Sequence, residues 1–175
     1  LQDAAPLVKA AKDSGADSIM VYGRPSDAVA IRKAMQKANL LDMPTITGWT
    51  SCAPEFVTDA RDVAEGTIVP SSFVVTESPK AKSFVDRFSK TFSTAGRLDA
   101  PSAVAQAYDS AYLLAQALQR APGGGDDLRQ ALEALTTFDG IVKHYSEPWS
   151  SVQHEALTSQ DVVVTQVRDG VLVHL

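Results

Sequence analysis

Two short segments carry residue types that can hold a small organic acid. The first follows an apolar run and places a guanidinium group beside the start of a predicted helix, and the second follows another apolar run with an indole and two hydroxyls. A guanidinium and helical N–H groups suit a carboxylate, and an indole suits an apolar or planar body. The candidate ligand-binding residues are Tyr22, Arg24, Pro25, Trp49, Thr50 and Ser51. The alternative is a solvated Arg24 and a Trp49 that caps the core.

The other residues that could do chemistry lack the neighbouring side chains that a catalytic or metal site needs. Cys52 lies near a predicted helix start, which favours a thiolate, but no histidine is placed to form a dyad with it. The single cysteine excludes an internal disulfide and a cysteine zinc site, and the three histidines lack metal-ligand spacing. We therefore predict no catalytic residue, no metal and no cofactor. A small α/β enzyme that uses Cys52 is a weaker hypothesis.

The composition is that of a water-soluble globular chain and excludes several function classes. The 175 residues are 45% hydrophobic and 21% charged, with a net charge of −5. An acidic chain without a Lys/Arg cluster is a poor partner for nucleic acid. No apolar run reaches the 18 residues of a membrane helix. The chain starts at Leu1 without Met or a signal peptide, so we expect it to be a piece of something longer or to have lost a leader.

The first 75 residues predict a parallel sheet. Helical patterns over 3–14, 25–39 and 53–64 alternate with short apolar runs over 17–23, 44–48 and 66–75. Such alternation is typical of right-handed crossovers between parallel strands. In these sheets ligands collect at the carboxyl ends of the strands, which is where both candidate segments lie.

The rest of the chain reads as helices and then strands. Helices are expected from Pro79, over 101–121 and over 128–135. We expect the side chain of Asp109, in the second of these helices, to be exposed or to act as a capping group. Strands are expected over 141–145, 162–167 and 171–175, the last two joined by the hairpin signal Asp169-Gly170. The helices present more apolar surface than these strands can cover, so part of the sheet is expected outside this sequence.

The ordered set of segments resembles the C-terminal portion of type I periplasmic solute-binding proteins, the leucine/isoleucine/valine-binding receptors of ABC transporters. The resemblance is carried by Ser14-Gly-Ala-Asp-Ser-Ile-Met-Val-Tyr-Gly23, by Pro44-Thr-Ile-Thr-Gly48 and by Val63-Ala-Glu-Gly66. It continues through Ala105-Gln-Ala-Tyr-Asp-Ser-Ala-Tyr-Leu-Leu-Ala-Gln-Ala-Leu118 and the stretch from His154 to Gly170. It covers nearly the whole chain.

The resemblance implies an α/β fold of two lobes that trap a solute between them. Residues 1–75 and 140–175 would form a three-layer C-terminal lobe with a parallel sheet, and 77–139 would be helices of an incomplete N-terminal lobe. The two candidate segments would hold the solute. Amino-acid binders carry an acidic residue for the ammonium group in the second segment, where this chain has Thr50. That difference favours aromatic or aliphatic carboxylates over amino acids.

The function implied is that of the periplasmic solute-binding component of an ABC importer. Its partners would be a small-molecule solute and a membrane permease, with no nucleic acid. The exposed helix faces would allow a homodimer or an exchange of domains between copies. The alternative function, with the same fold, is a ligand-sensing domain of a receptor or regulator.

Overall fold

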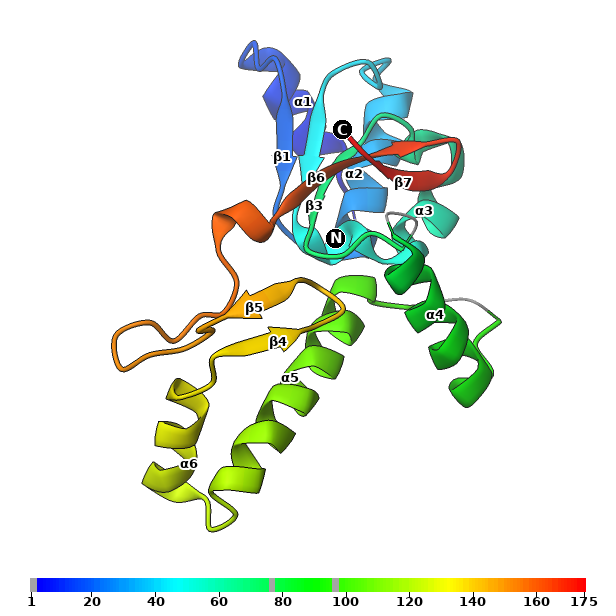
Figure 1. Cartoon of the computed structure of the whole chain (residues 1–175). Helices are drawn as coiled ribbons and strands as arrows, with labels where there is room; N and C mark the ends of the chain where they lie inside the picture. The colour runs from blue at the N-terminus through cyan, green and yellow to red at the C-terminus, as the bar shows by residue number, and fades with distance from the viewer. Residues whose placement is uncertain (1–2, 76–77, 96–97) are drawn as a thin grey trace. The chain divides into compact units, whose positions relative to one another are not determined.

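A computed structural model describes residues 3–75, 78–95 and 98–175 (Figure 1). The chain divides into two compact units. Unit 1 contains the residues up to Pro101 together with Val163–Leu175, and unit 2 contains Ser102–Val162. The boundaries expected from the sequence were at 75–77 and 139–140, so the helix from Pro79 groups with unit 1 and residues 140–162 group with unit 2. How the units correspond to the lobes of the resembled family stays a prediction.

Unit 1 alternates helices and strands as the sequence predicts. Its elements are α1 (Ala5–Asp13), β1 (Ile19–Val21), α2 (Pro25–Lys37), β2 (Thr45–Thr47), η1 (Trp49–Cys52), α3 (Pro54–Ala60), η2 (Arg61–Ala64), β3 (Ile68–Ser71), α4 (Pro79–Phe92), β6 (Val163–Arg168) and β7 (Val171–His174). Proline occupies the first turn of α1, α2, α3 and α4, where its missing N–H costs nothing. The predicted helix over 53–64 is two pieces, because its second half winds as the 3₁₀ helix η2.

The described strands of unit 1 form one five-stranded sheet in the order β1-β2-β3-β6-β7. β1, β2 and β3 are parallel, which confirms the predicted parallel sheet. β6 pairs antiparallel with β3 and with β7, so the predicted hairpin adds an antiparallel edge to the sheet. β1 lies at the other edge and pairs only with β2 among the described strands.

One face of this sheet, the helix side, is covered by α2 and α3. Val21, Val69 and Val167 point to it and pack with Phe56 and Val29 of these helices in one apolar cluster. The alternate residues of each strand point to the opposite face, which we call the open side. The open-side residues are Met20, Ile46, Ile68, Pro70, Val164, Gln166, Arg168, Val171 and Val173.

A buried cation ties the helices of the helix side to the sheet. Arg32 of α2 is almost fully buried and its guanidinium group donates to the carbonyl oxygens of Val63 (2.6 Å), Glu65 (2.9 Å) and Leu41 (3.3 Å). It also donates to Thr45 Oγ1 at 3.0 Å. Burial lowers the pKa of Arg32. In place of water, the guanidinium group therefore has neutral acceptors from the α2–β2 connection, from β2 and from residues 63–65.

Unit 2 packs two helices against a small hairpin of strands. Its elements are α5 (Pro101–Arg120, apart from its first residue), α6 (Gly125–Glu133), β4 (Thr137–Asp139), β5 (His144–Ser146) and η3 (Ser159–Asp161). Leu113, Leu135 and Tyr145 form the centre of its core. The strand expected over 141–145 is wrong in position: β4 and β5 pair across a turn at 140–143. Ile141 and Val142 have the apolar pattern of a strand, but they lie in the tight turn that begins at Gly140.

Candidate functional site

The two candidate segments meet at one edge of the sheet in unit 1. Val21 and Thr47 are paired in the parallel register of β1 and β2, so the turns that follow them leave the sheet side by side. Thr50 Oγ1 donates a hydrogen bond to the carbonyl oxygen of Gly23 at 2.7 Å. A Cβ at Gly48 would lie 3.4 Å from the Tyr22 ring. The sequence-predicted residues of both turns are thereby brought together.

The first turn is held at the start of α2. Pro25 stands in the first turn of the helix, and Asp27 Oδ2 accepts a hydrogen bond from the backbone N–H of Arg24 at 3.0 Å. The Nε atom of Arg24 lies 3.6 Å from the same carboxylate oxygen, and the Arg24 side chain is 79% exposed. The Tyr22 side chain is also exposed. Arg24 and Tyr22 can therefore reach a molecule that approaches this edge.

The second turn presents an indole and encloses a hydroxyl. Trp49 opens η1 and is 47% exposed, so it is about half-buried. Ser51 is buried, and its Oγ has no hydrogen-bond partner among the described residues. Cys52 is buried with its Sγ 3.1 Å from Ser71 Oγ. Burial against a hydroxyl gives no sign of the nucleophile that an enzyme hypothesis would need.

A hollow of about 410 Å³ runs from the first turn along the edge of β1. It is bounded by α1, by β1 and by the start of α2. Its lining is mostly apolar and consists of Leu7, Val8, Ala11, Ile19, Met20, Val21, Tyr22, Gly23, Asp27 and Ile31. The hollow places open space directly beside Tyr22, although neither Arg24 nor Trp49 lines it.

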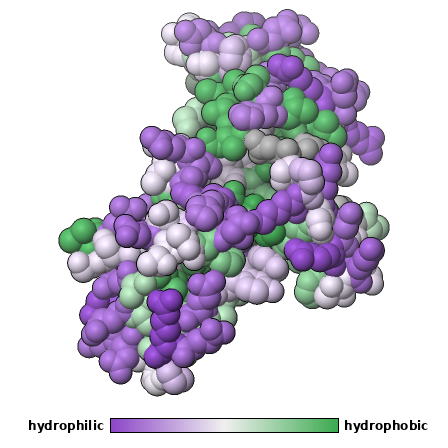
Figure 2. Space-filling model, in the orientation of Figure 1, coloured by the Kyte–Doolittle hydropathy of each residue, from purple (hydrophilic) through white to green (hydrophobic). Residues whose placement is uncertain are grey.

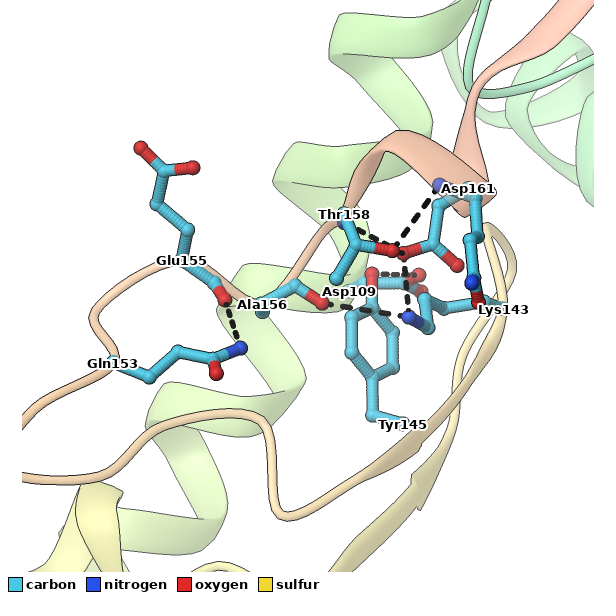
Figure 3. A network of polar contacts seen from close by, with 9 residues as sticks. Asp109, Lys143, Tyr145, Gln153, Glu155, Ala156, Thr158 and Asp161 are labelled. Carbon is cyan, nitrogen blue, oxygen red and sulfur yellow. Dashed lines mark hydrogen bonds and ion pairs between the residues drawn. The ribbon is translucent and has the colours of Figure 1, made fainter.

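Unit 2 carries a buried carboxylate that the sequence reasoning misplaced (Figure 3). Asp109 of α5 is fully buried, so the expectation of an exposed or capping side chain is wrong. Its carboxylate accepts hydrogen bonds from the N–H groups of Ile141 (2.6 Å) and Val142 (2.9 Å) and from the hydroxyl of Tyr145 (3.0 Å). A Cβ at Gly140 would lie 2.4 Å from Asp109 Oδ2, which explains the glycine.

The Tyr145 hydroxyl is kept protonated by this arrangement. Burial raises the pKa of Tyr145, and the negative charge and hydrogen bond of Asp109 raise that pKa further. A second contact lies beside it, where Lys143 Nζ is 2.7 Å from Asp161 Oδ2 (Figure 3). Asp161 Oδ2 also accepts from the Thr158 N–H at 2.7 Å. The network fastens α5, the β4–β5 turn and η3 together, which is a structural role.

Two classes of feature are not found in the described part of the chain. No cluster of three or more His, Cys, Asp or Glu side chains in residues 3–75, 78–95 and 98–175 is placed to hold a metal ion. Within the same ranges, no helix combines the length and the apolar character needed to span a membrane.

Comparison with known proteins assigns the family. The family model described as "Periplasmic binding protein" matches residues 1–171. The chain belongs to this family. The comparison with curated proteins finds no match.

Solved structures with low sequence identity share the fold of this chain. A leucine-binding protein (LivK) from Thermotoga maritima is 22% identical with a TM-score of 0.81, and the match covers 100% of this chain and 48% of that protein. A periplasmic binding protein type 1 from Bordetella pertussis is 19% identical with a TM-score of 0.84, and the match covers 100% of this chain and 50% of that protein. A fatty acid ABC transporter substrate-binding protein from Thermomonospora curvata is 16% identical with a TM-score of 0.76, and the match covers 99% of this chain and 46% of that protein. The chain spans about half the length of these proteins, and its fold is the type I periplasmic binding protein fold.

Proposed function

We propose that this chain supplies one wall of the solute site in the binding component of an ABC-type importer. The observation that carries the proposal is the hydrogen bond from Thr50 Oγ1 to the Gly23 carbonyl, which joins the two turns at the carboxyl ends of adjacent parallel strands. Open α/β sheets bind their ligands at this edge. Tyr22, Arg24 and Trp49 are the exposed side chains that would contact the solute.

We propose a carboxylate with an apolar body and no ammonium group as the solute. The similar solved structures include a leucine-binding and a fatty acid-binding protein, and a carboxylate on an apolar chain is what these two ligands share. Arg24 is the exposed cation of the first turn, and Trp49 offers a half-exposed apolar face. The hydroxyl group of Thr50 carries no charge to balance an ammonium group, and its proton is already donated to Gly23. The Ser51 hydroxyl, buried and without a hydrogen-bond partner among the described residues, is a further candidate donor to a solute oxygen.

The remaining elements of the proposal follow from the family. The protein acts in the periplasm, it delivers the solute to a membrane permease, and it carries out no chemical reaction. Closure of two lobes around the solute would provide both the desolvation and the signal to the permease.

The test compares two ligands that differ only in the ammonium group. Calorimetry measures the binding of leucine and of 4-methylpentanoate, which is leucine without its amino group, to a longer protein that includes this chain. We expect 4-methylpentanoate to bind at least about 10-fold more tightly, because no acidic group of the second turn stabilises the ammonium ion. Tighter binding of leucine would overturn the proposed solute class.

Variants of the first turn test the wall itself. Arg24→Ala should weaken carboxylate binding by about 10-fold or more, while Arg87→Ala, at an exposed position of α4, should leave it unchanged. Equal losses for the two variants would mean that Arg24 acts only through the net charge. Equal affinity of this chain alone and of the longer protein would show that a second wall is not needed.

A further inference from the structure

A second hollow of unit 1 lies on the helix side of the sheet, between α3 and the β6–β7 hairpin. Its volume is about 310 Å³. The lining includes Val57 of α3, Phe73 after β3, and the helix-side residues Ser71, Thr165 and Leu172. Among the described residues that line it, none has a charged side chain and most are apolar. We call this hollow the apolar cavity.

The buried hydroxyl groups of the apolar cavity already have partners within the protein. Ser71 Oγ donates to the carbonyl oxygen of Phe73 at 2.8 Å and accepts from the N–H group of the same residue at 3.1 Å. Thr165 Oγ1 donates to the carbonyl oxygen of Val69 at 2.6 Å. A charged group placed here would lose its water and meet no opposite charge. The cavity therefore suits an uncharged apolar group rather than a carboxylate.

One end of the apolar cavity lies where the second turn of the candidate site ends. Cys52, Ala53 and Pro54 line the cavity and directly follow residues 49–51 in the chain. The 3₁₀ helix η1 packs against β3, and Cys52 Sγ lies 3.1 Å from Ser71 Oγ at the carboxyl end of that strand. Because β3 is the parallel neighbour of β2, this end of the cavity lies at the same sheet edge as the two turns.

A different apolar region of unit 1 is seen in Figure 2. In this view the strands lie in front of α1 and α2, so the apolar side chains that gather over the strands belong to the open side. The apolar cavity is on the other face and is bounded by α3, by the hairpin and by the segment after β3. A site that surrounds an alkyl chain removes more of its surface from water than a single sheet face does. The cavity is therefore the better place for such a chain.

The volume of the apolar cavity indicates the size of the group that fits. A cavity of about 150 Å³ accommodates benzene, so a cavity of about 310 Å³ accommodates an alkyl chain of roughly eight carbons. The branched side chain of leucine would leave much of this space empty.

We infer that the apolar cavity receives the tail of the solute, and that the solute is a straight-chain carboxylate of about ten carbons. This inference rests on the proposed function, in which Arg24 binds the carboxylate outside the cavity. The second turn then contacts both parts of the solute, because Trp49 is half-exposed beside the carboxylate and Cys52 lines the space for the tail.

The test measures the binding of decanoate and of 4-methylpentanoate to the longer protein by calorimetry. Burial of the additional methylene groups should make decanoate bind at least about 10-fold more tightly. Val57→Phe places a larger side chain in the cavity, so it should remove this advantage and change the affinity for 4-methylpentanoate by less than about 2-fold. The matched control is Val152→Phe, at a 90% exposed position of unit 2, which should change neither affinity.

A second measurement needs no substitution. Cys52 lines the apolar cavity, so a bound tail should slow the alkylation of its thiol by N-ethylmaleimide, whereas saturating 4-methylpentanoate should not. With decanoate at about ten times its Kd the fraction of empty sites falls about 10-fold, and the alkylation rate should fall by about as much. Mass spectrometry of the peptide that contains Cys52 follows this rate, and it decides the matter if Val57→Phe does not fold.

Other results would overturn the inference. Equal affinities for the two acids, or an equal effect of a folded Val57→Phe variant on both, would place the tail outside the cavity. Tight binding of decanoate with unchanged alkylation of Cys52 would lead to the same conclusion. Binding of neither acid, or tighter binding of leucine than of 4-methylpentanoate, would instead overturn the proposed function and the inference with it.

Discussion

Two buried charged side chains, Arg32 and Asp109, each hold together segments that are far apart in the chain. Arg32 donates to carbonyl oxygens at residues 63–65 and in the α2–β2 connection of unit 1, and Asp109 accepts from the β4–β5 turn and from Tyr145 in unit 2. Neither has an oppositely charged partner in these contacts. Their hydrogen bonds must therefore offset the full cost of desolvating the charge.

Arg32→Lys is expected to destabilise unit 1 by about 2–4 kcal/mol. Lysine keeps the charge but has no planar fork, so several of the four acceptors of Arg32 lose their donor while the cation stays buried. Urea unfolding followed by the fluorescence of Trp49, in a Trp149→Phe background, measures the loss. The exposed neighbour provides the control, since Lys33→Arg should change stability by less than about 0.5 kcal/mol. A similar small effect for both variants would contradict this account of Arg32.

Asp109→Asn is expected to destabilise unit 2 by about 3 kcal/mol. The amide has one acceptor oxygen where three donors converge, and its NH₂ group would face a backbone N–H or the Tyr145 hydroxyl. Unfolding followed by Trp149 fluorescence, in a Trp49→Phe background, should show the loss. Asp127→Asn on the exposed face of α6 should have little effect. If the two variants were equally stable, the Asp109 contacts would not be important for unit 2.

These residues also show how far sequence reasoning reaches. The two turns at Arg24 and Thr50 could be predicted to lie together, because apolar runs and crossover lengths define parallel neighbours. The role of Arg32 could not, since three of its four acceptors are backbone carbonyls, which carry no signature in the sequence. The same holds for Asp109, whose donors include the N–H groups of Ile141 and Val142.

At the scale of elements, the β6–β7 hairpin completes the antiparallel edge of the sheet. Asp169 and Gly170 both adopt positive φ angles, 52° and 72°, as a two-residue turn of this type requires. The carboxylate of Glu65 accepts from both of their N–H groups, at 3.1 Å and 2.7 Å. The turn is therefore held by its own conformation and by a side chain from the η2–β3 connection.

Gly170→Ala is expected to destabilise unit 1 by about 1 kcal/mol. The loss of stability does not come from a steric clash, because the nearest atom to an added Cβ is Val57 Cγ1 at 3.9 Å. It comes from placing an L-residue at positive φ. The midpoint of urea unfolding followed by Trp49 fluorescence measures it. Gly123→Ala is the control in unit 2, followed by Trp149 fluorescence, since that glycine has open space and no positive φ; it should be neutral or slightly stabilising. An unchanged unit 1 midpoint for Gly170→Ala would contradict the proposed strain.

The elements that the sequence predicted correctly are those with a strong local signal. β1, β2, β3 and the hairpin follow from apolar runs that end at glycine or polar turns. The strand expected at 141–145 was misplaced, because Ile141 and Val142 look like a strand but serve as turn donors to Asp109. A contact of this kind, made across a long stretch of sequence, has no local pattern.

At the scale of the whole molecule, the two units are expected to unfold in separate steps. The apolar cluster around Phe56 lies entirely in unit 1, and the cluster around Leu113 lies entirely in unit 2. Separate cores give separate cooperative transitions. Urea titrations of the Trp149→Phe and Trp49→Phe variants should show different midpoints. Coincident midpoints and slopes in the two variants would instead show one cooperative unit.

Unit 1 is discontinuous in the chain, and this has a consequence for its biogenesis. β6 lies between β3 and β7 in the sheet, yet its residues are synthesised only after those of unit 2. A chain released after Val162 contains all of unit 2 but lacks β6, so β3 exposes a bare hydrogen-bonding edge. Premature termination at that point would leave an aggregation-prone product, because an unpaired strand edge recruits strands from other chains.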